Sequence, residues 1–254
     1  MINSLEKIKD IRKKLNSKKA TIGTWMQIPS SDIAEILSKS GFDWVTIDME
    51  HGNFDSTNIV DIFRTIELGG AAPLVRLPNS DITNIKKILD CGASGIIIPN
   101  IESANQLKKC ISSCNWPPEG TRGVGFSRAN LFGKNFKKYK EKKVKPLVVA
   151  IIESKMGYKN LDEILQVENL DSIFIGPYDL SASFNMLEDF KSKKFKKIIN
   201  SIKKKCSKRK IPCGIHLVEP DIKKLKKITT EFQLIAYSID AQLILHSIKN
   251  IKQI

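Results

Sequence analysis

The sequence predicts a (β/α)8 barrel, in which eight parallel strands close into a cylinder surrounded by helices. Eight short and mostly continuous apolar runs alternate with longer segments of helical periodicity. Buried parallel strands covered by helices produce this pattern. The length of 254 residues is also that of one such barrel. A doubly wound open sheet is the alternative, and it is disfavoured because no GxGxxG motif follows the first apolar run.

The predicted strands are rich in Ile, Val and Leu: Thr21–Met26, Asp43–Asp48, Pro73–Leu77, Gly95–Pro99, Leu147–Glu153, Ser172–Gly176, Pro212–His216 and Gln233–Ser238. Between them, apolar residues recur three and four positions apart, which predicts amphipathic helices. Residues 1–20 are expected to form an extra helix before the barrel. Residues 116–145 form a long excursion between the fourth and fifth strands, as expected of an active-site mouth or an oligomer contact. No repeat or linker marks a second domain, so residues 1–254 are predicted to form a single domain.

The net charge of +15 raises the question of a polyanionic partner. Only six of the 42 basic residues are Arg, and the Lys-rich stretches 191–210 and 223–227 carry apolar residues at helical spacing. These features predict solvated helix faces, and no nucleic-acid-binding motif accompanies them, so no nucleic-acid partner is expected. No apolar run is long enough to span a membrane, and no signal peptide is recognisable. The five cysteines contain no CxxC pair, which favours reduced, buried thiols and a cytoplasmic protein.

Polar side chains stand where four predicted strands end. His51 follows the second strand, Arg76 lies at the end of the third, Glu153 ends the fifth and Asp179 follows the sixth. Three of them have a simpler explanation: His51 as a loop histidine, Arg76 as an ion-pair partner and Asp179 as a helix cap. Glu153 is harder to explain in this way, because a charge at a buried strand end needs a partner or a metal. Because the carboxyl ends of barrel strands share one rim and catalytic residues gather there, the four together indicate an active site.

Glu153 and Asp179 supply carboxylate oxygens, the ligands that suit a hard cation such as Mg²⁺ or Mn²⁺. Two protein ligands leave coordination positions for a chelating 2-oxo acid such as pyruvate, whose ketone the metal would polarise. Arg76 could then stabilise an enolate oxygen, and His51 could move the proton, directly or through water.

Five segments carry a family resemblance: GTWMQIPSSDIAEILSKSGFDWVTIDMEHG, PLVRLPNSDITNIKKILDCGASGIIIPNIESA, WPPEGTRGVG, IIESKMGYKNLDEIL and LDSIFIGPYDLSAS. With them, the sequence resembles the HpcH/HpaI aldolases, which are metal-dependent class II pyruvate aldolases of the citrate-lyase-β-like superfamily. The resemblance covers nearly the whole chain. The sequence departs from the pattern at Ile151, where several members have Gln, and at Phe184–Met186.

The resemblance implies roles for individual residues. It implies His51 as the catalytic base, Asp90 as the acid that orients it, and Arg76 as the arginine that binds pyruvate. It implies Glu153 and Asp179 as metal ligands and the backbone amides of Tyr178 and Asp179 as the site of the substrate carboxylate. It places Arg122 and Gly123 at the mouth of the site and Trp25 at the rim of the first strand. It also implies Mg²⁺, Mn²⁺ or Co²⁺ as cofactor. The last helix is expected to be swapped onto a neighbouring subunit of a homohexamer, a trimer of dimers.

The expected activity is that of a carbon–carbon lyase. Such an enzyme reversibly cleaves a 4-hydroxy-2-oxo acid, including 2-keto-3-deoxy sugar acids, into pyruvate and an aldehyde through a pyruvate enolate on the metal. A citrate-synthase-like condensation of acetyl-CoA with an oxo acid, of the siderophore type, is an enzymatic alternative. A non-catalytic polyanion-binding protein that exploits the basic charge is a third.

Overall fold

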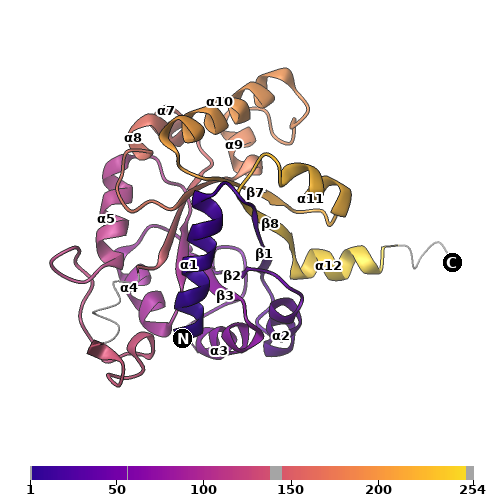
Figure 1. Ribbon diagram of the computed structural model, residues 1–254. Coiled ribbons are helices and arrows are strands. Elements are labelled where there is room, and N and C mark those ends of the chain that lie inside the picture. The colour runs from indigo at the N-terminus through magenta and orange to yellow at the C-terminus, as the bar shows by residue number, and fades with distance from the viewer. Residues whose placement is uncertain (1, 56, 138–144, 250–254) are drawn as a thin grey trace.

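Eight parallel strands form a closed barrel in the computed structural model, which describes residues 2–55, 57–137 and 145–249 (Figure 1). Each strand pairs with the next along the chain, and β8 pairs with β1. The strands are β1 (Thr21–Met26), β2 (Trp44–Asp48), β3 (Ala72–Arg76), β4 (Gly95–Ile98), β5 (Leu147–Ile152), β6 (Ser172–Ile175), β7 (Cys213–Leu217) and β8 (Leu234–Ile239). The predicted fold is confirmed, and all eight strands lie within one residue of their predicted bounds.

Helices surround the barrel and carry side-chain caps at several of their first turns (Figure 1). The side chains of Ser30, Asp81, Ser103 and Ser192 each accept a hydrogen bond from a backbone N–H that has no partner within its helix. The helices are α1 (Ile2–Asn16), α2 (Ser31–Lys39), α3 (Ile59–Gly69), α4 (Ile82–Cys91), α5 (Ala104–Cys114), η1 (Arg128–Asn130), α7 (Lys155–Lys159), α8 (Leu161–Ile164), α9 (Pro177–Ser183), α10 (Lys193–Arg209), α11 (Ile222–Ile228) and α12 (Asp240–Ser247).

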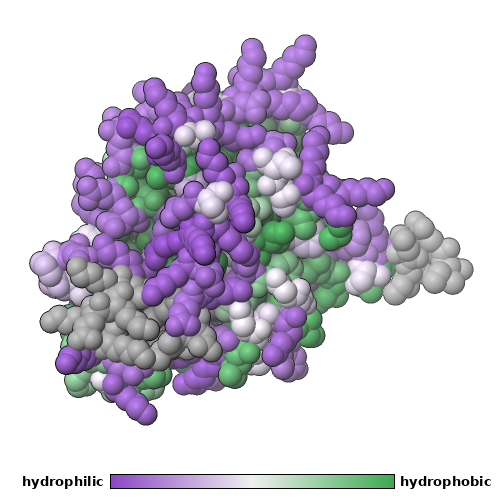
Figure 2. Space-filling model, in the orientation of Figure 1, coloured by the Kyte–Doolittle hydropathy of each residue, from purple (hydrophilic) through white to green (hydrophobic). Residues whose placement is uncertain are grey.

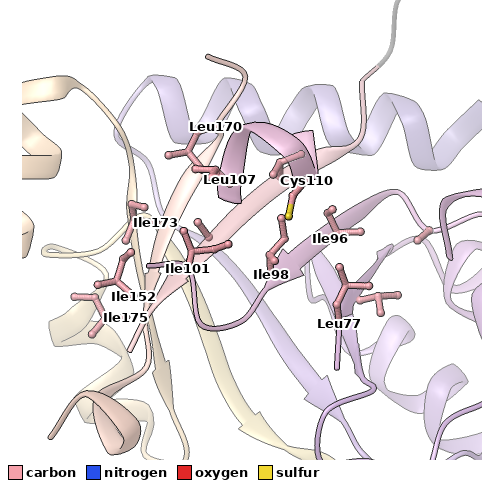
Figure 3. Close-up of a cluster of buried hydrophobic side chains, with 14 of the residues drawn as sticks. Leu77, Ile96, Ile98, Ile101, Leu107, Cys110, Ile152, Leu170, Ile173 and Ile175 are labelled. Carbon is pink, nitrogen blue, oxygen red and sulfur yellow. The ribbon is translucent and has the colours of Figure 1, made fainter. Parts of the chain in front are cut away.

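The apolar core has an outer layer between the strands and the helices. Figure 3 shows part of it, where Leu107 and Cys110 of α5 face Ile96 and Ile98 of β4. All four side chains are buried. Because alternate residues of a strand point to opposite faces, the remaining strand residues point into the barrel and fill its interior.

The inner layer is closed at the amino end of the strands by α1. Ile8, Ile11 and Leu15 of α1 join the cluster that fills the barrel. Charged residues fix the helix there: Arg12 makes an ion pair with Asp171, just before β6, and Lys14 with Asp43, just before β2. The expected helix before the barrel is therefore present and lies across the end opposite the predicted catalytic rim.

Trp44 fills the barrel interior beside Gly23. Its indole N–H donates to Thr21 Oγ1 at 2.7 Å, and a Cβ at Gly23 would lie 2.0 Å from its ring. We expect Gly23→Ala to lower the free energy of unfolding by about 3 kcal/mol, since neither the backbone nor a fully buried indole can move aside cheaply. Urea denaturation measures the loss. Gly125→Ala is the control because a Cβ there meets nothing within 4 Å, and equal stability of the two variants would contradict the expectation.

The long connection before β5 follows α5 and not a strand, so it belongs to the amino end of the barrel. Its contacts agree, because Arg128 pairs with Glu67 in the last turn of α3 and Arg122 pairs with Asp90 near the end of α4. Within one chain the excursion therefore does not build the mouth of the predicted site. Its part in an oligomer contact stays a prediction, and residues 138–144 lie outside the described part of the chain.

The Lys-rich stretches form solvated helix surfaces as predicted. In α10, Phe195, Ile198, Ile202 and Cys206 are buried, whereas most of the lysines are exposed. Figure 2 shows hydrophilic side chains over the part of the surface where Figure 1 places α10. All five cysteines are free thiols, and four of them are buried. Within the described ranges, no helix is both long enough and apolar enough to cross a membrane.

The last helix leaves the barrel. Figure 1 shows α12 extending away from the strands. Its main contacts are with β1 and β8, and Leu243 packs against the core. Its apolar residues Ile244 and Leu245, and Ile248 just beyond it, are about half exposed. An apolar helix face left in water is a surface that another chain can cover.

Candidate active site

A cavity of about 320 Å³ opens at the carboxyl end of the strands. The four strand-end residues predicted from the sequence, His51, Arg76, Glu153 and Asp179, all line it. Parallel strands bring them together although they are spread over more than 120 positions. Trp25 and Tyr178, two further predicted residues, also line this cavity.

Asp48 holds the Arg76 guanidinium in a two-pronged ion pair beneath the cavity. Arg76 Nε donates to Oδ1 at 2.8 Å, and one terminal nitrogen donates to Oδ2 at 2.6 Å. Asp48 is fully buried and also accepts from Gln27 and from the backbone N–H groups of Glu50 and His51. Burial alone would raise the pKa of Asp48, but the hydrogen bond and charge of Arg76 bring it below its usual value.

Two further contacts fix the orientation of the Arg76 guanidinium. Its remaining terminal nitrogen lies 3.0 Å from Glu50 Oε2. Its central carbon lies 4.2 Å from the centre of the Trp25 ring, a cation–π contact. Arg76 is 8% exposed, so it is a cation fixed on three sides and open to the cavity that it lines. A fixed cation of this kind can stabilise a negative oxygen without reorganising during a reaction.

Glu153 and Asp179 stand on neighbouring strands at the same rim. Glu153 follows β5 and accepts a 2.6 Å hydrogen bond from the backbone N–H of Asn100. Asp179 lies in the first turn of α9, directly after β6. Gly176 packs against the Glu153 side chain. A Cβ at position 176 would lie 2.7 Å from Glu153 Oε2, so any larger residue would displace this carboxylate.

The charges around Glu153 indicate a place for a cation. Burial, and to a smaller degree the nearby charges of Glu50 and Asp179, raise the pKa of Glu153 to about 7. Ionising both carboxylates costs free energy when they are alone, and a bound divalent cation makes that ionisation favourable by neutralising their charge. No group of three or more His, Cys, Asp or Glu side chains suited to a metal occurs in the described ranges. Glu153 and Asp179 line one cavity, and two carboxylates fit a hard cation whose other positions are left to water or substrate.

His51 lies at the edge of the cavity with an exposed side chain. Its backbone N–H donates to Asp48 Oδ1, and the next residue, Gly52, donates to the Asp48 carbonyl oxygen. A Cβ at Gly52 would lie 2.4 Å from that oxygen, so this tight turn needs glycine. The turn places an accessible imidazole within the same cavity as Arg76 and the two carboxylates.

Three predicted residues do not join this cavity within one chain. Asp90 lies near the end of α4, and its carboxylate contacts Arg122 at 2.6 Å and Ser127 at 3.5 Å. Helix α4 starts after β3 and runs back along the barrel, so Asp90 lies toward the end opposite His51. Arg122 and Gly123 belong to the connection at that same end and do not line the cavity. Their predicted roles as orienting acid and mouth residues are not formed by a single copy of the chain.

Four residues of the site were not singled out from the sequence. Asp48, Glu50 and Gln27 are strand-end polar residues, like those that were selected, so their position could have indicated them. His216 also lines the cavity and stacks on Trp25, with 4.9 Å between the ring centres. His216 lies inside β7, in the run CGIHL, and not at the end of the strand where site residues were sought. Its neighbours on other strands become apparent only in the folded barrel.

Comparison with known proteins gives consistent matches over this barrel. The family model for HpcH/HpaI aldolase/citrate lyase matches residues 21–247. The chain is 39% identical over 178 residues, 69% of its length and 70% of the relative's, to the hydroxypyruvate/pyruvate aldolase of Roseobacter denitrificans. It is 33% identical over 202 residues, 79% of each chain, to the 5-keto-4-deoxy-D-glucarate aldolase of Salmonella gallinarum.

A solved structure agrees over almost the whole chain. The HpcH/HpaI aldolase/citrate lyase family protein of Burkholderia cenocepacia superimposes with a TM-score of 0.89 and 26% identity, covering 96% of this chain and 98% of the other. The family match includes every strand of the barrel and all the residues of the cavity described above. This chain therefore belongs to the HpcH/HpaI aldolase/citrate lyase family.

Proposed function

We propose that this protein is a class II aldolase that reversibly cleaves a 4-hydroxy-2-oxo acid into pyruvate, or a closely related 2-oxo acid, and an aldehyde. The observation that carries the proposal is one cavity in which a fixed guanidinium, an accessible imidazole and a carboxylate pair come together. The aldolases among the relatives support the same class of reaction.

Each side chain then has a task. The hydroxyl at C4 gives its proton to His51, directly or through water, and the C3–C4 bond breaks to release the aldehyde. The electron pair of that bond moves onto C3 and the C2 oxygen, where Arg76 stabilises the enolate charge. The proton taken by His51 is then returned, directly or through water, to C3 and completes the 2-oxo acid. The first amides of α9, at Tyr178 and Asp179, lie where a substrate carboxylate can accept their hydrogen bonds.

Glu153 and Asp179 are the proposed ligands of a divalent cation, with Mg²⁺, Mn²⁺ and Co²⁺ all compatible with two carboxylates. Once bound there, such an ion supplies Lewis-acid polarisation of the 2-oxo group. Because the mechanism needs no Schiff base, no lysine takes part in it.

Asp90 keeps its predicted role only in an oligomer. In one chain it pairs with Arg122, so contact with His51 requires Asp90 to come from a neighbouring subunit. The exposed apolar residues of α12 support a swapped helix and a homo-oligomer such as a hexamer. The five free thiols support a cytoplasmic location.

Deuterium exchange at the pyruvate methyl group tests the enolate step without knowledge of the aldehyde. We expect NMR in D₂O to show exchange that EDTA abolishes and that His51→Ala slows by about 10²-fold or more, the usual contribution of a proton-transfer group. Glu168→Gln is the control, because Glu168 is exposed in the connection between α8 and β6, away from the cavity. Exchange that persists unchanged in EDTA, or a covalent adduct trapped by borohydride with pyruvate, would contradict the proposal.

A further inference from the structure

Glu50 lies against Arg76 but has no task in the proposed reaction. It follows β2, in the turn that also carries His51, and its backbone N–H donates to Asp48 Oδ1 at 3.1 Å. Its Oε2 atom is 3.0 Å from one terminal nitrogen of Arg76, Nη1. This oxygen is buried, yet among the described residues it accepts no aligned hydrogen bond. The contact between Glu50 and Arg76 is therefore mainly an attraction between charges.

Two carboxylates share the single positive charge of Arg76 before any substrate binds. Asp48 is fully buried and accepts from Nε at 2.8 Å and from Nη2 at 2.6 Å, which takes up one edge of the guanidinium. Glu50 contacts the remaining nitrogen. Burial raises the pKa of Glu50 above its usual value even though Arg76 lies beside it, so the ion pair does not fully compensate this charge. One cation between two carboxylates leaves an excess of negative charge beside Arg76.

An anionic oxygen that binds Arg76 comes close to this charge. Because Asp48 occupies one edge of the guanidinium, the N–H groups left for a ligand are those of Nη1 and the second one of Nη2. An oxygen bound at Nη1 lies no more than two hydrogen-bond lengths, about 6 Å, from Glu50 Oε2. Two unit charges at this distance repel by an amount worth about tenfold in affinity where water shields them in part. The repulsion acts on an anionic oxygen and spares an uncharged one.

The reaction places both kinds of oxygen at Arg76. Under the proposed function, the oxygen on C2 is uncharged in the 2-oxo acid and negative in the enolate. We propose that Glu50 limits how tightly Arg76 binds the enolate oxygen. Glu50 is not among the residues that line the cavity, so it is a positioning residue that acts through Arg76. The inference rests on the proposed function and adds to it a residue that weakens binding of the enolate and leaves binding of the 2-oxo acid little affected.

Oxalate and oxamate measure this effect because they differ in the charge at one end. Oxalate carries a second anionic group, as the enolate does, whereas oxamate has an uncharged amide in the same place. Isothermal titration calorimetry at pH 8 with saturating Mg²⁺ gives both dissociation constants for the wild type and for Glu50→Gln, which loses the charge and keeps the shape. We expect oxalate to bind about tenfold more tightly to the variant and oxamate to change by less than about threefold. The same shift at two saturating Mg²⁺ concentrations shows that metal occupancy is not its cause.

Glu219→Gln is the matched control. It removes one negative charge from an exposed position after β7, outside the residues that line the cavity, and should keep the oxalate-to-oxamate ratio of the wild type. Glu50→Ala removes the contact with Arg76 as well as the charge, and oxalate should again bind more tightly than to the wild type. Weaker binding of oxalate to both Glu50 variants would mean that Glu50 only supports Arg76, and would overturn the inference.

The remaining outcomes separate this inference from the function on which it rests. An unchanged ratio in Glu50→Gln, together with metal-dependent exchange of pyruvate, would overturn the role of Glu50 and leave the aldolase proposal intact. A gain in affinity for oxamate as large as that for oxalate would also overturn it, because the charge of the ligand oxygen would then not matter. A wild-type protein that neither exchanges pyruvate nor binds oxalate would overturn both.

Discussion

Replacing Arg76 by Leu should reduce pyruvate exchange by about 10³-fold and also lower the free energy of unfolding by about 3 kcal/mol. The first effect follows because the fixed cation that stabilises the enolate oxygen is lost. The second follows because Asp48, fully buried and bonded twice to the guanidinium, loses its partner. Deuterium exchange by NMR and urea denaturation measure the two losses.

A double variant separates catalysis from stability. In Arg76→Leu with Asp48→Asn, both buried charges are gone, while the amide oxygen introduced at position 48 can still accept from the backbone N–H groups of Glu50 and His51. We expect the double variant to regain most of the lost stability and none of the exchange. Recovery of exchange together with stability would mean that Arg76 acts by supporting the fold and not by contacting the substrate.

The second large effect is a pH dependence of stability without metal. The pKa of Glu153 is raised to about 7 in the folded protein from an ordinary value of 4.5. The folded state therefore retains a proton that the unfolded state has lost, and stability falls as pH rises between these two values. The expected loss from this one group is about 3 kcal/mol, complete above about pH 7. Urea denaturation in EDTA between pH 5 and 8 measures it.

Glu153→Gln should remove this dependence, because the amide cannot ionise. Above pH 7 in EDTA, the variant should be more stable than the wild type, and Mn²⁺ should stabilise the wild type much more than the variant. Glu168→Gln, at an exposed position, is the matched control and should follow the wild type. Parallel pH curves for wild type and Glu153→Gln would show that Glu153 does not carry the raised pKa.

The strands could be predicted because each is a short apolar run between polar segments. Ile96, Ile97 and Ile98 are all buried, because both faces of a barrel strand are covered. Such a strand is therefore a continuous apolar run that is visible in the sequence. The long connection does not lie at the mouth of its own chain's site, and its role in an oligomer contact stays a prediction. A loop that follows a strand lies at the carboxyl end of the barrel, whereas a loop that follows a helix lies at the amino end. This connection follows α5, so it lies at the amino end, and its length alone does not reveal this.

The site was predictable to the extent that its residues end strands. His51, Arg76, Glu153 and Asp179 converge as expected. Asp90 shows the limit, since a residue assigned through family resemblance can belong to a site that a single chain does not complete. His216 shows another limit. Its Nε2 atom lies 3.0 Å from the carbonyl oxygen of Ser238, which belongs to a bulge in β8, and no local pattern in β7 reports an irregularity in β8.

The helix that closes the amino end of the barrel has a kinetic consequence. Side chains fill the barrel beneath the cavity, and Ile8, Ile11 and Leu15 of α1 complete that packing, so no passage leads out through the amino end. Under the proposed reaction, the 2-oxo acid occupies the bottom beside Arg76, and the aldehyde lies above it. In cleavage the aldehyde must depart before the 2-oxo acid, and in condensation the 2-oxo acid must arrive first. An ordered sequence of binding and release thus follows from the packed interior beneath the site, which α1 completes without touching either molecule.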